Sequence, residues 1–191
     1  MSSLYRPGMD LTEYFEDYSY FPEFTRYIFD EVGKTIRYRR SLKREDIVLI
    51  SVWKTLWKKE GLEIRMETSE YNVEKVTSRI FTANHDDQAE VRGLLLDIEG
   101  LCSVSAVTPV KLASTILSVT LPEKYGVFDI RVAEALGIKG SDERAAVDAI
   151  FKMREIAHEH CVLTKKLWTP RMVDQALFVL HKQNKGLGAI K

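Results

Sequence analysis

The sequence predicts an all-α protein of two interpacked helical lobes. Apolar residues recur three or four positions apart along most of the chain, which is the helical period, whereas the alternation typical of strands is short and rare. Two Thr-Pro pairs, at 108–109 and 169–170, each place a capping hydroxyl before a proline at a first helical position. At 191 residues the chain is long enough for one buried core or for two small lobes that share an interface. We therefore expect residues 1–191 to form a single helical unit.

The first three expected helices are 11–19, 22–38 and 43–58. Aromatic side chains recur at helical spacing in the first two, and Trp53 and Trp57 are four residues apart in the third. Aromatic residues at this spacing are more typical of a core than of a ligand pocket. The aromatic side chains of this region are therefore assigned to the core: Tyr14, Phe15, Tyr18, Tyr20, Phe21, Phe24, Tyr27 and Phe29, together with the two tryptophans.

Two more helices are expected in the middle of the chain, at 72–83 and 86–99, each with one apolar face. Asn84 or Asp86 is the expected cap at the start of the second. The stretch from Gly61 to Ser69 is expected to be a loop, although its apolar residues Leu62, Ile64 and Met66 alternate as they do in a strand.

Four helices are expected to complete the chain, at 109–121, 130–136, 142–160 and 170–183. The first and last begin at the Thr-Pro pairs. The third begins with acidic residues, which complement the positive end of the helix dipole. Gly137 and the glycine at 140 bracket the turn that precedes it.

Composition excludes several classes of protein. No stretch approaches the roughly 18 apolar residues of a membrane span, and the N-terminus lacks the apolar core of a signal peptide. Cys102 and Cys161 are too few for a disulfide scaffold and lack the spacing of a metal site. The run His158-Glu159-His160-Cys161 offers only two residues on one helix face, which is too few for a metal. We expect a non-secreted protein without a metal ligand set.

Lys111 and Asp129 form the candidate catalytic pair. Lys111 lies in the first turn of 109–121, and Asp129 directly precedes 130–136. A helix of about 13 residues, followed by a short return through Pro122 and Gly126, brings the two helix starts near each other. An amine and a carboxylate then share one site. Each residue also has a simple structural interpretation, Lys111 as a solvated cation and Asp129 as an N-cap.

A polar stripe is expected beside this pair. Lys111, Thr115 and Ser118 fall on one side of an otherwise apolar helix. We expect a polar group to lie along that stripe. The helix dipole at the first turn disfavours the protonated form of an amine, which is the form that cannot attack.

The two segments around this pair carry a resemblance to a known family. Residues 107–113 read VTPVKLA and residues 128–132 read FDIRV, with the aspartate 18 residues after the lysine. This resembles the helix-hairpin-helix DNA glycosylase superfamily of endonuclease III and 8-oxoguanine glycosylase, in which LPGVGxKxA precedes a VDxHV-type segment at about that distance. The lysine, the alanine two residues later, the spacing and the aspartate coincide.

The resemblance implies a fold and a reaction. A helix-hairpin-helix-like core is expected at about 86–137, and the remaining N- and C-terminal helices form the second lobe. The implied enzyme removes a damaged or modified base from DNA. Lys111 attacks the sugar to form a Schiff base, and Asp129 stabilises developing positive charge, with abasic-site lyase activity as a possible second step. No metal or organic cofactor is needed. The implied partner is duplex DNA with a damaged or abasic nucleotide, bound by a monomer in the cytoplasm beside the nucleoid or in the nucleus.

The sequence departs from the family at the hairpin. No glycine lies between Leu101 and Lys111, although the family uses hairpin glycines to approach a DNA phosphate closely. Ser105 and Thr108 are candidate substitutes through their hydroxyls. The cysteine run of the endonuclease III branch is missing as well, so no iron–sulfur cluster is expected.

Further nucleic-acid contacts are expected from basic residues. Arg131, two residues past the aspartate, is the first candidate for a phosphate contact. Arg37, Arg39 and Arg40 form a basic patch with an aromatic between them, which suits phosphate binding but is equally typical of a solvated helix end. The net charge of zero leaves two other functions open. One is a non-catalytic nucleic-acid-binding relative of the same fold, and the other is a helical protein-interaction module.

Overall fold

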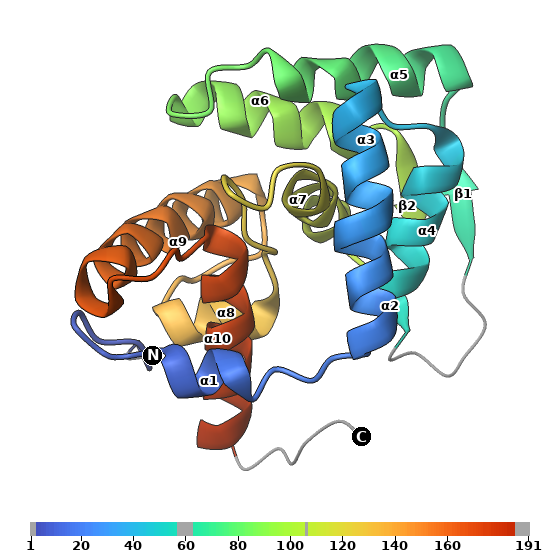
Figure 1. Cartoon of the computed structure of the whole chain (residues 1–191). Helices are drawn as coiled ribbons and strands as arrows, with labels where there is room; N and C mark the ends of the chain where they lie inside the picture. The colour runs from blue at the N-terminus through green and yellow to red at the C-terminus, as the bar shows by residue number, and fades with distance from the viewer. Residues whose placement is uncertain (1–2, 57–62, 106, 186–191) are drawn as a thin grey trace.

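The all-α prediction is confirmed. The computed structural model describes residues 3–56, 63–105 and 107–185, and in these ranges helices dominate beside one pair of short strands. The helices form two groups, which Figure 1 shows as an upper right and a lower left half. No helix in the described ranges is both long enough and apolar enough to cross a bilayer.

The larger group holds the helices of the first two thirds of the chain except α1. It consists of α2 (Pro22–Arg26), the π-helix η1 (Tyr27–Val32), α3 (Gly33–Arg39), α4 (Arg44–Thr55), α5 (Glu70–Ser78), the 3-10 helix η2 (Arg79–Phe81), α6 (Gln88–Glu99) and α7 (Pro109–Thr120). The elements α2, η1 and α3 follow one another without a break, as the expected helix 22–38 requires. This long helix packs closely on α7, because a Cβ at Gly33 would lie 2.6 Å from the carbonyl oxygen of Val119.

The smaller group joins the two ends of the chain. It consists of α1 (Thr12–Glu16), α8 (Ile130–Leu136), α9 (Glu143–Thr164) and α10 (Pro170–Asn184). Helix α10 packs against the other three. The segment 86–137 is therefore divided between the groups, with α6 and α7 in the larger one and α8 in the smaller one.

The prediction of a loop from Gly61 to Ser69 is wrong for residues 64–66, which form a strand in the described part of this stretch. Strand β1 (Ile64–Met66) pairs antiparallel with β2 (Cys102–Val104), and Ile64 lies opposite Val104. Arg65 is exposed between two partly buried apolar neighbours, as the alternation requires. A strand of three residues needs a partner to be stable, and here the partner lies far along the chain.

Helix α7 is buried on almost every side, which corrects the expected polar stripe. Its end-on view in Figure 1 places it in the middle of the molecule, where the larger group faces the smaller one. Thr115 and Ser118 are both 0% exposed. The Thr115 hydroxyl donates to the carbonyl oxygen of Lys111 at 2.7 Å. A hydroxyl that bonds its own helix backbone needs no other polar partner. The Ser118 hydroxyl has no hydrogen-bond partner among the described residues, but it too is enclosed in the core.

The expected helix starts are found, with two differences in the caps. Thr169 accepts a hydrogen bond from the backbone N–H of Met172 at 3.3 Å, whereas Thr108, at the N-cap position of α7, makes no side-chain capping bond. Helix α6 is capped by Asp87, whose carboxylate accepts from the Ala89 N–H at 2.7 Å. The expected cap residue Asn84 instead bonds the backbone of Asp86 in the preceding turn.

Candidate active site

Asp129 is held in place by the backbone of the segment that precedes it. Gly126 lets this segment pass between α9 and α10, since a Cβ there would lie 2.5 Å from the sulfur of Met153. The N–H of Val127 donates to the Asp174 carboxylate of α10 at 2.6 Å, and the N–H of Phe128 donates to the Ser114 hydroxyl of α7 at 3.1 Å. Both helix groups therefore fix the position of Asp129.

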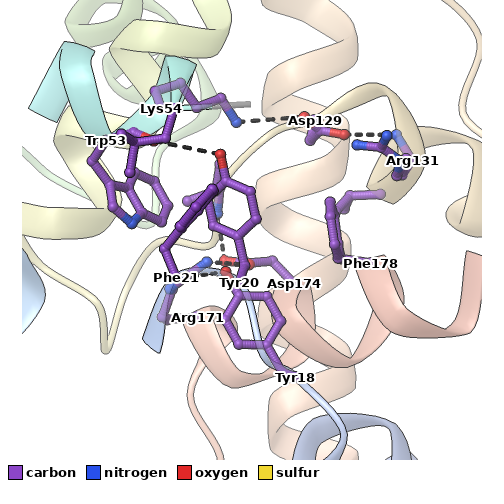
Figure 2. A pocket seen from close by; sticks show the side chains of 13 residues that line it. Tyr18, Tyr20, Phe21, Trp53, Lys54, Asp129, Arg131, Arg171, Asp174 and Phe178 are labelled. Carbon is purple, nitrogen blue, oxygen red and sulfur yellow. Dashed lines mark hydrogen bonds and ion pairs between the residues drawn. The ribbon is translucent and has the colours of Figure 1, made fainter. Parts of the chain in front are cut away.

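The Asp129 carboxylate is both a helix cap and one partner of an ion pair. It accepts a hydrogen bond from the backbone N–H of Arg131 at 3.0 Å, so the N-cap interpretation is confirmed. Its other oxygen lies 3.5 Å from the Nζ of Lys54, and Figure 2 shows this pair along one edge of the group of side chains drawn there. Burial raises the pKa of Asp129. The charges of Lys54, Arg131 and Lys111 and the N–H bond outweigh burial, so the pKa lies below its usual value.

Lys54 is a buried cation that the sequence analysis did not select. It lies in the last turn of α4, and its side chain is only 10% exposed. Burial lowers the pKa of Lys54, against the opposing charges of Asp129 and Asp174. A lowered pKa increases the fraction of lysine in the neutral amine form, and only this form can act as a nucleophile.

One cavity, which we call the aromatic cavity, lies on one side of Asp129 and has a volume of about 370 Å³. Its walls come from the connection between α1 and α2, the end of α4, the start of α8 and α10 (Figure 2). The lining residues are Tyr18, Tyr20, Phe21, Trp53, Lys54, Leu56, Val127, Asp129, Arg131, Val132, Arg171, Asp174 and Phe178. The two helix groups therefore both contribute to this cavity.

A hydrogen-bond network holds the aromatic wall formed by Tyr20 and Phe21. The Trp53 indole N–H donates to the Thr25 hydroxyl at 2.9 Å, and that hydroxyl donates to the Tyr20 carbonyl at 2.6 Å. Phe21 has a left-handed backbone with φ of 41°, which a bulky residue rarely adopts. The N–H of Thr25 helps to hold it there by donating to the Phe21 carbonyl at 2.8 Å. A strained aromatic residue in a cavity wall is typical of a binding site.

A second ion pair forms another wall of the aromatic cavity. Arg171 and Asp174 are both buried and are hydrogen bonded to each other along one face of α10. The Arg171 guanidinium lies 4.2 Å from the Phe29 ring centroid and 5.5 Å from that of Trp53. Burial raises the pKa of Asp174 to about 6, against the opposing effect of Arg171. Together with Lys54, Asp129 and Arg131, this pair supplies polar groups to a cavity whose other walls are largely aromatic.

A second cavity, which we call the lysine cavity, has a volume of about 350 Å³. It is lined by Lys54, Val107, Thr108, Lys111, Asp129, Ile130, Arg131, Glu134 and His181. The expected pair Lys111 and Asp129 therefore lines one cavity, together with Thr108 and Arg131. The Nε2 of His181 and the Glu134 carboxylate are hydrogen bonded at 2.6 Å in the lining of the same cavity.

The other expected nucleic-acid contacts line neither cavity. The Ser105 hydroxyl accepts a hydrogen bond at 3.2 Å from the N–H of Glu63, the residue before strand β1. Arg37 donates to the carbonyl oxygen of Val119 at 3.1 Å, so it caps the end of α7. The Arg37 contact uses N–H groups that would otherwise donate to a phosphate.

The rest of the basic patch also has partners within the chain. Arg39 forms an ion pair with Asp46, and Arg40 donates to the Phe81 carbonyl at 3.0 Å with its guanidinium 5.1 Å from the Phe81 ring centroid. The interpretation as a helix end therefore accounts for the described contacts of these arginines.

The assignment of all the aromatic residues to the core was too broad. Tyr18, Tyr20, Phe21 and Trp53 line the aromatic cavity, whereas Trp57 lies outside the described residues. One sequence signal could have indicated the cavity: Arg171 and Asp174 lie three residues apart on the face of α10 that also carries Phe178. Two opposite charges on a core-facing stripe indicate a buried polar site.

No group of three or more metal-ligating side chains occurs in the described parts of the chain. His160 has a structural role there, since its Nε2 accepts the Leu11 N–H at 3.1 Å.

Comparisons of the chain with models of protein families, with curated proteins and with solved structures give no match.

Proposed function

We propose that this protein is a DNA glycosylase that extrudes a damaged or modified base from duplex DNA and breaks its bond to the sugar beside Asp129. The observation that carries the proposal is the position of Asp129, which lines both the aromatic cavity and the lysine cavity. A carboxylate at this junction would lie beside the sugar of a nucleotide whose base occupies one cavity. There it would stabilise the positive charge that develops as the base leaves.

The aromatic cavity suits an extruded base. Enzymes that act on a flipped base hold it between aromatic or apolar side chains and read its edge with a few polar groups. Tyr20, Trp53 and Phe178 supply rings, and the buried pair Arg171 and Asp174 supplies a donor and an acceptor. The cavity therefore offers both interactions.

The lysine cavity suits the DNA backbone. Lys111, Arg131 and the Thr108 hydroxyl line it near the start of α7, where the helix dipole favours an anion. The resemblance of residues 107–113 and 128–132 to helix-hairpin-helix glycosylases is the second support for the proposal. In that family a lysine at the position of Lys111 forms a Schiff base with the sugar. We propose a monomer that acts where cellular DNA is, beside the nucleoid or in the nucleus.

Base release is the test. The full chain is incubated in excess over duplexes that each carry one oxidised, alkylated, deaminated or mismatched base, and the free base is quantified by mass spectrometry. We expect release from at least one lesion and none from the undamaged duplex of the same sequence. Binding of these duplexes is followed in parallel by fluorescence anisotropy at several salt concentrations.

The outcomes separate the candidate functions. Release of no base across the panel, with salt-dependent DNA binding, would replace the enzyme by a non-catalytic nucleic-acid-binding relative. No DNA binding at low salt would leave only a protein-interaction module.

A further inference from the structure

We propose that Lys54, and not Lys111, supplies the amine that attacks the sugar, an inference that rests on the proposed function. Three residues line both cavities, namely Lys54, Asp129 and Arg131. Of these, Lys54 alone carries an amine. Lys111 lines the lysine cavity and is not among the residues of the aromatic cavity.

The geometry follows from the position of the base. A base in the aromatic cavity has its glycosidic bond at the cavity's border, and the sugar then lies at the junction between the two cavities. The Nζ of Lys54 is at that junction, 3.5 Å from the Asp129 carboxylate. A nucleophile and the group that receives its proton are typically found within such a short reach.

Burial gives Lys54 the second property of a nucleophilic amine. Its position in the last turn of α4 opposes this, since the helix dipole there favours a cation. Burial is the larger effect, because a buried ammonium loses the hydration that stabilises its charge. The net effect is a lowered pKa for Lys54.

The step balances without a cofactor. The neutral Nζ donates its lone pair to C1′ of the deoxyribose, and the bond from C1′ to the base breaks, its electron pair leaving with the base, which takes a proton from solvent. The new ammonium loses a proton to Asp129. The bond from C1′ to O4′ then breaks, O4′ takes that proton, and an iminium joins C1′ to Lys54. Water adds to the iminium carbon, the bond from C1′ to Nζ breaks, and C1′ leaves as an aldehyde while Lys54 regains its neutral amine and a proton passes to solvent.

A purely structural role for Lys54, as the counter-ion of Asp129, predicts different results. Lys54→Arg keeps a positive charge beside the carboxylate but has no nucleophilic amine at any ordinary pH. If Lys54 only balances charge, this variant should behave as the wild type does. If Lys54 is the nucleophile, the variant should keep its fold and lose the covalent intermediate.

The test is borohydride trapping, with the site of attachment mapped. The full chain is mixed with a duplex that contains one abasic site, and sodium borohydride donates hydride to the iminium carbon to leave a stable amine. Protease digestion and tandem mass spectrometry then locate the modified lysine. We expect it at Lys54 in the wild type and in Lys111→Arg, whatever the yield of the latter. The matched surface control is Lys152→Arg on α9, which should be trapped as the wild type is.

Mapping in the wild type keeps the inference testable even if a variant unfolds. An adduct at Lys111 or at any other amine overturns the inference and leaves the proposed function standing. Release of a damaged base without any trapped adduct also overturns the inference alone, since the enzyme then uses water. Absence of both base release and adduct overturns the inference and the proposed function together.

Discussion

The aromatic cavity and the lysine cavity share three lining residues, Lys54, Asp129 and Arg131, and all their other lining residues differ. The aromatic cavity is assembled from four distant segments, and one of its walls is a buried ion pair that hydrogen bonds hold in place. The lysine cavity lies mainly between the starts of two helices, α7 and α8. The first suits a flat ring and the second an anion. Changes in the aromatic cavity should therefore alter stability and base binding, and changes in the lysine cavity should alter the response to salt.

The largest effect is expected for Arg171→Met in the aromatic cavity. This variant leaves Asp174 buried without its cation, and breaking a buried pair in this way costs about 3–5 kcal/mol of unfolding free energy. The measurement is urea unfolding followed by circular dichroism. Lys152→Met removes one partner of the exposed pair with Glu155 and should cost no more than about 0.5 kcal/mol. Equal losses in the two variants would show that Arg171 is not buried against Asp174 in solution.

A second effect is expected from the titration of Asp174. Because its pKa is raised from 3.8 to about 6 in the folded state, the folded protein binds a proton there in a pH range where the unfolded chain does not. Stability from this group is thus full below about pH 4 and is lost as the pH rises through 6. The unfolding free energy of the wild type, minus that of Asp174→Asn, should fall by about 3 kcal/mol at most between these limits. A difference that is flat or rises would mean that Arg171 keeps the carboxylate ionised.

A smaller effect is expected at Phe178. Its ring lies near Arg131, which lines both cavities, and near Tyr20 of the aromatic wall. The Arg131 guanidinium is 5.0 Å from the ring centroid of Phe178, and the Tyr20 ring is 6.1 Å away. Phe178→Ala should weaken binding of a lesion-bearing duplex by about 1–3 kcal/mol, the usual worth of stacking one base, while binding of undamaged duplex changes little. Phe151→Ala, outside both cavities, is the control. If both duplexes weaken equally, Phe178 does not contact the base.

The smallest effect is expected at Lys111. A lysine that contacts one phosphate adds about one unit to the slope of log binding constant against log salt concentration, so Lys111→Met should reduce the slope by about one. Lys75→Met, on the exposed side of α5, should leave the slope unchanged. A slope that is equal in wild type and Lys111→Met would remove Lys111 from the DNA contact.

The residues of the lysine cavity were easier to predict from the sequence than those of the aromatic cavity, because they are less widely separated along the chain. Lys111 and Asp129 are joined by one helix and a short return, so their proximity followed from helix geometry. Lys54 and Asp129 are 75 residues apart, and only the packed fold brings them together. Periodicity also fails to separate a cavity wall from a core, since Trp53 lines the cavity while only 2% exposed. The helices themselves were predictable because most of them carry an apolar face at helical spacing, and several begin at a capping residue.

The rate of base release by Asp129→Asn tests the central claim most directly. Asp142→Asn is its matched control, because Asp142 caps α9 by accepting the Ala145 N–H at 3.0 Å but lines neither cavity. Asparagine caps a helix about as well as aspartate, so both variants should fold. We expect Asp129→Asn to release base at least about 100-fold more slowly than the wild type, the usual cost of losing a charge-stabilising group, and Asp142→Asn to keep the wild-type rate. If Asp129→Asn released base at the wild-type rate, the claim that this carboxylate is the centre of the site would be contradicted.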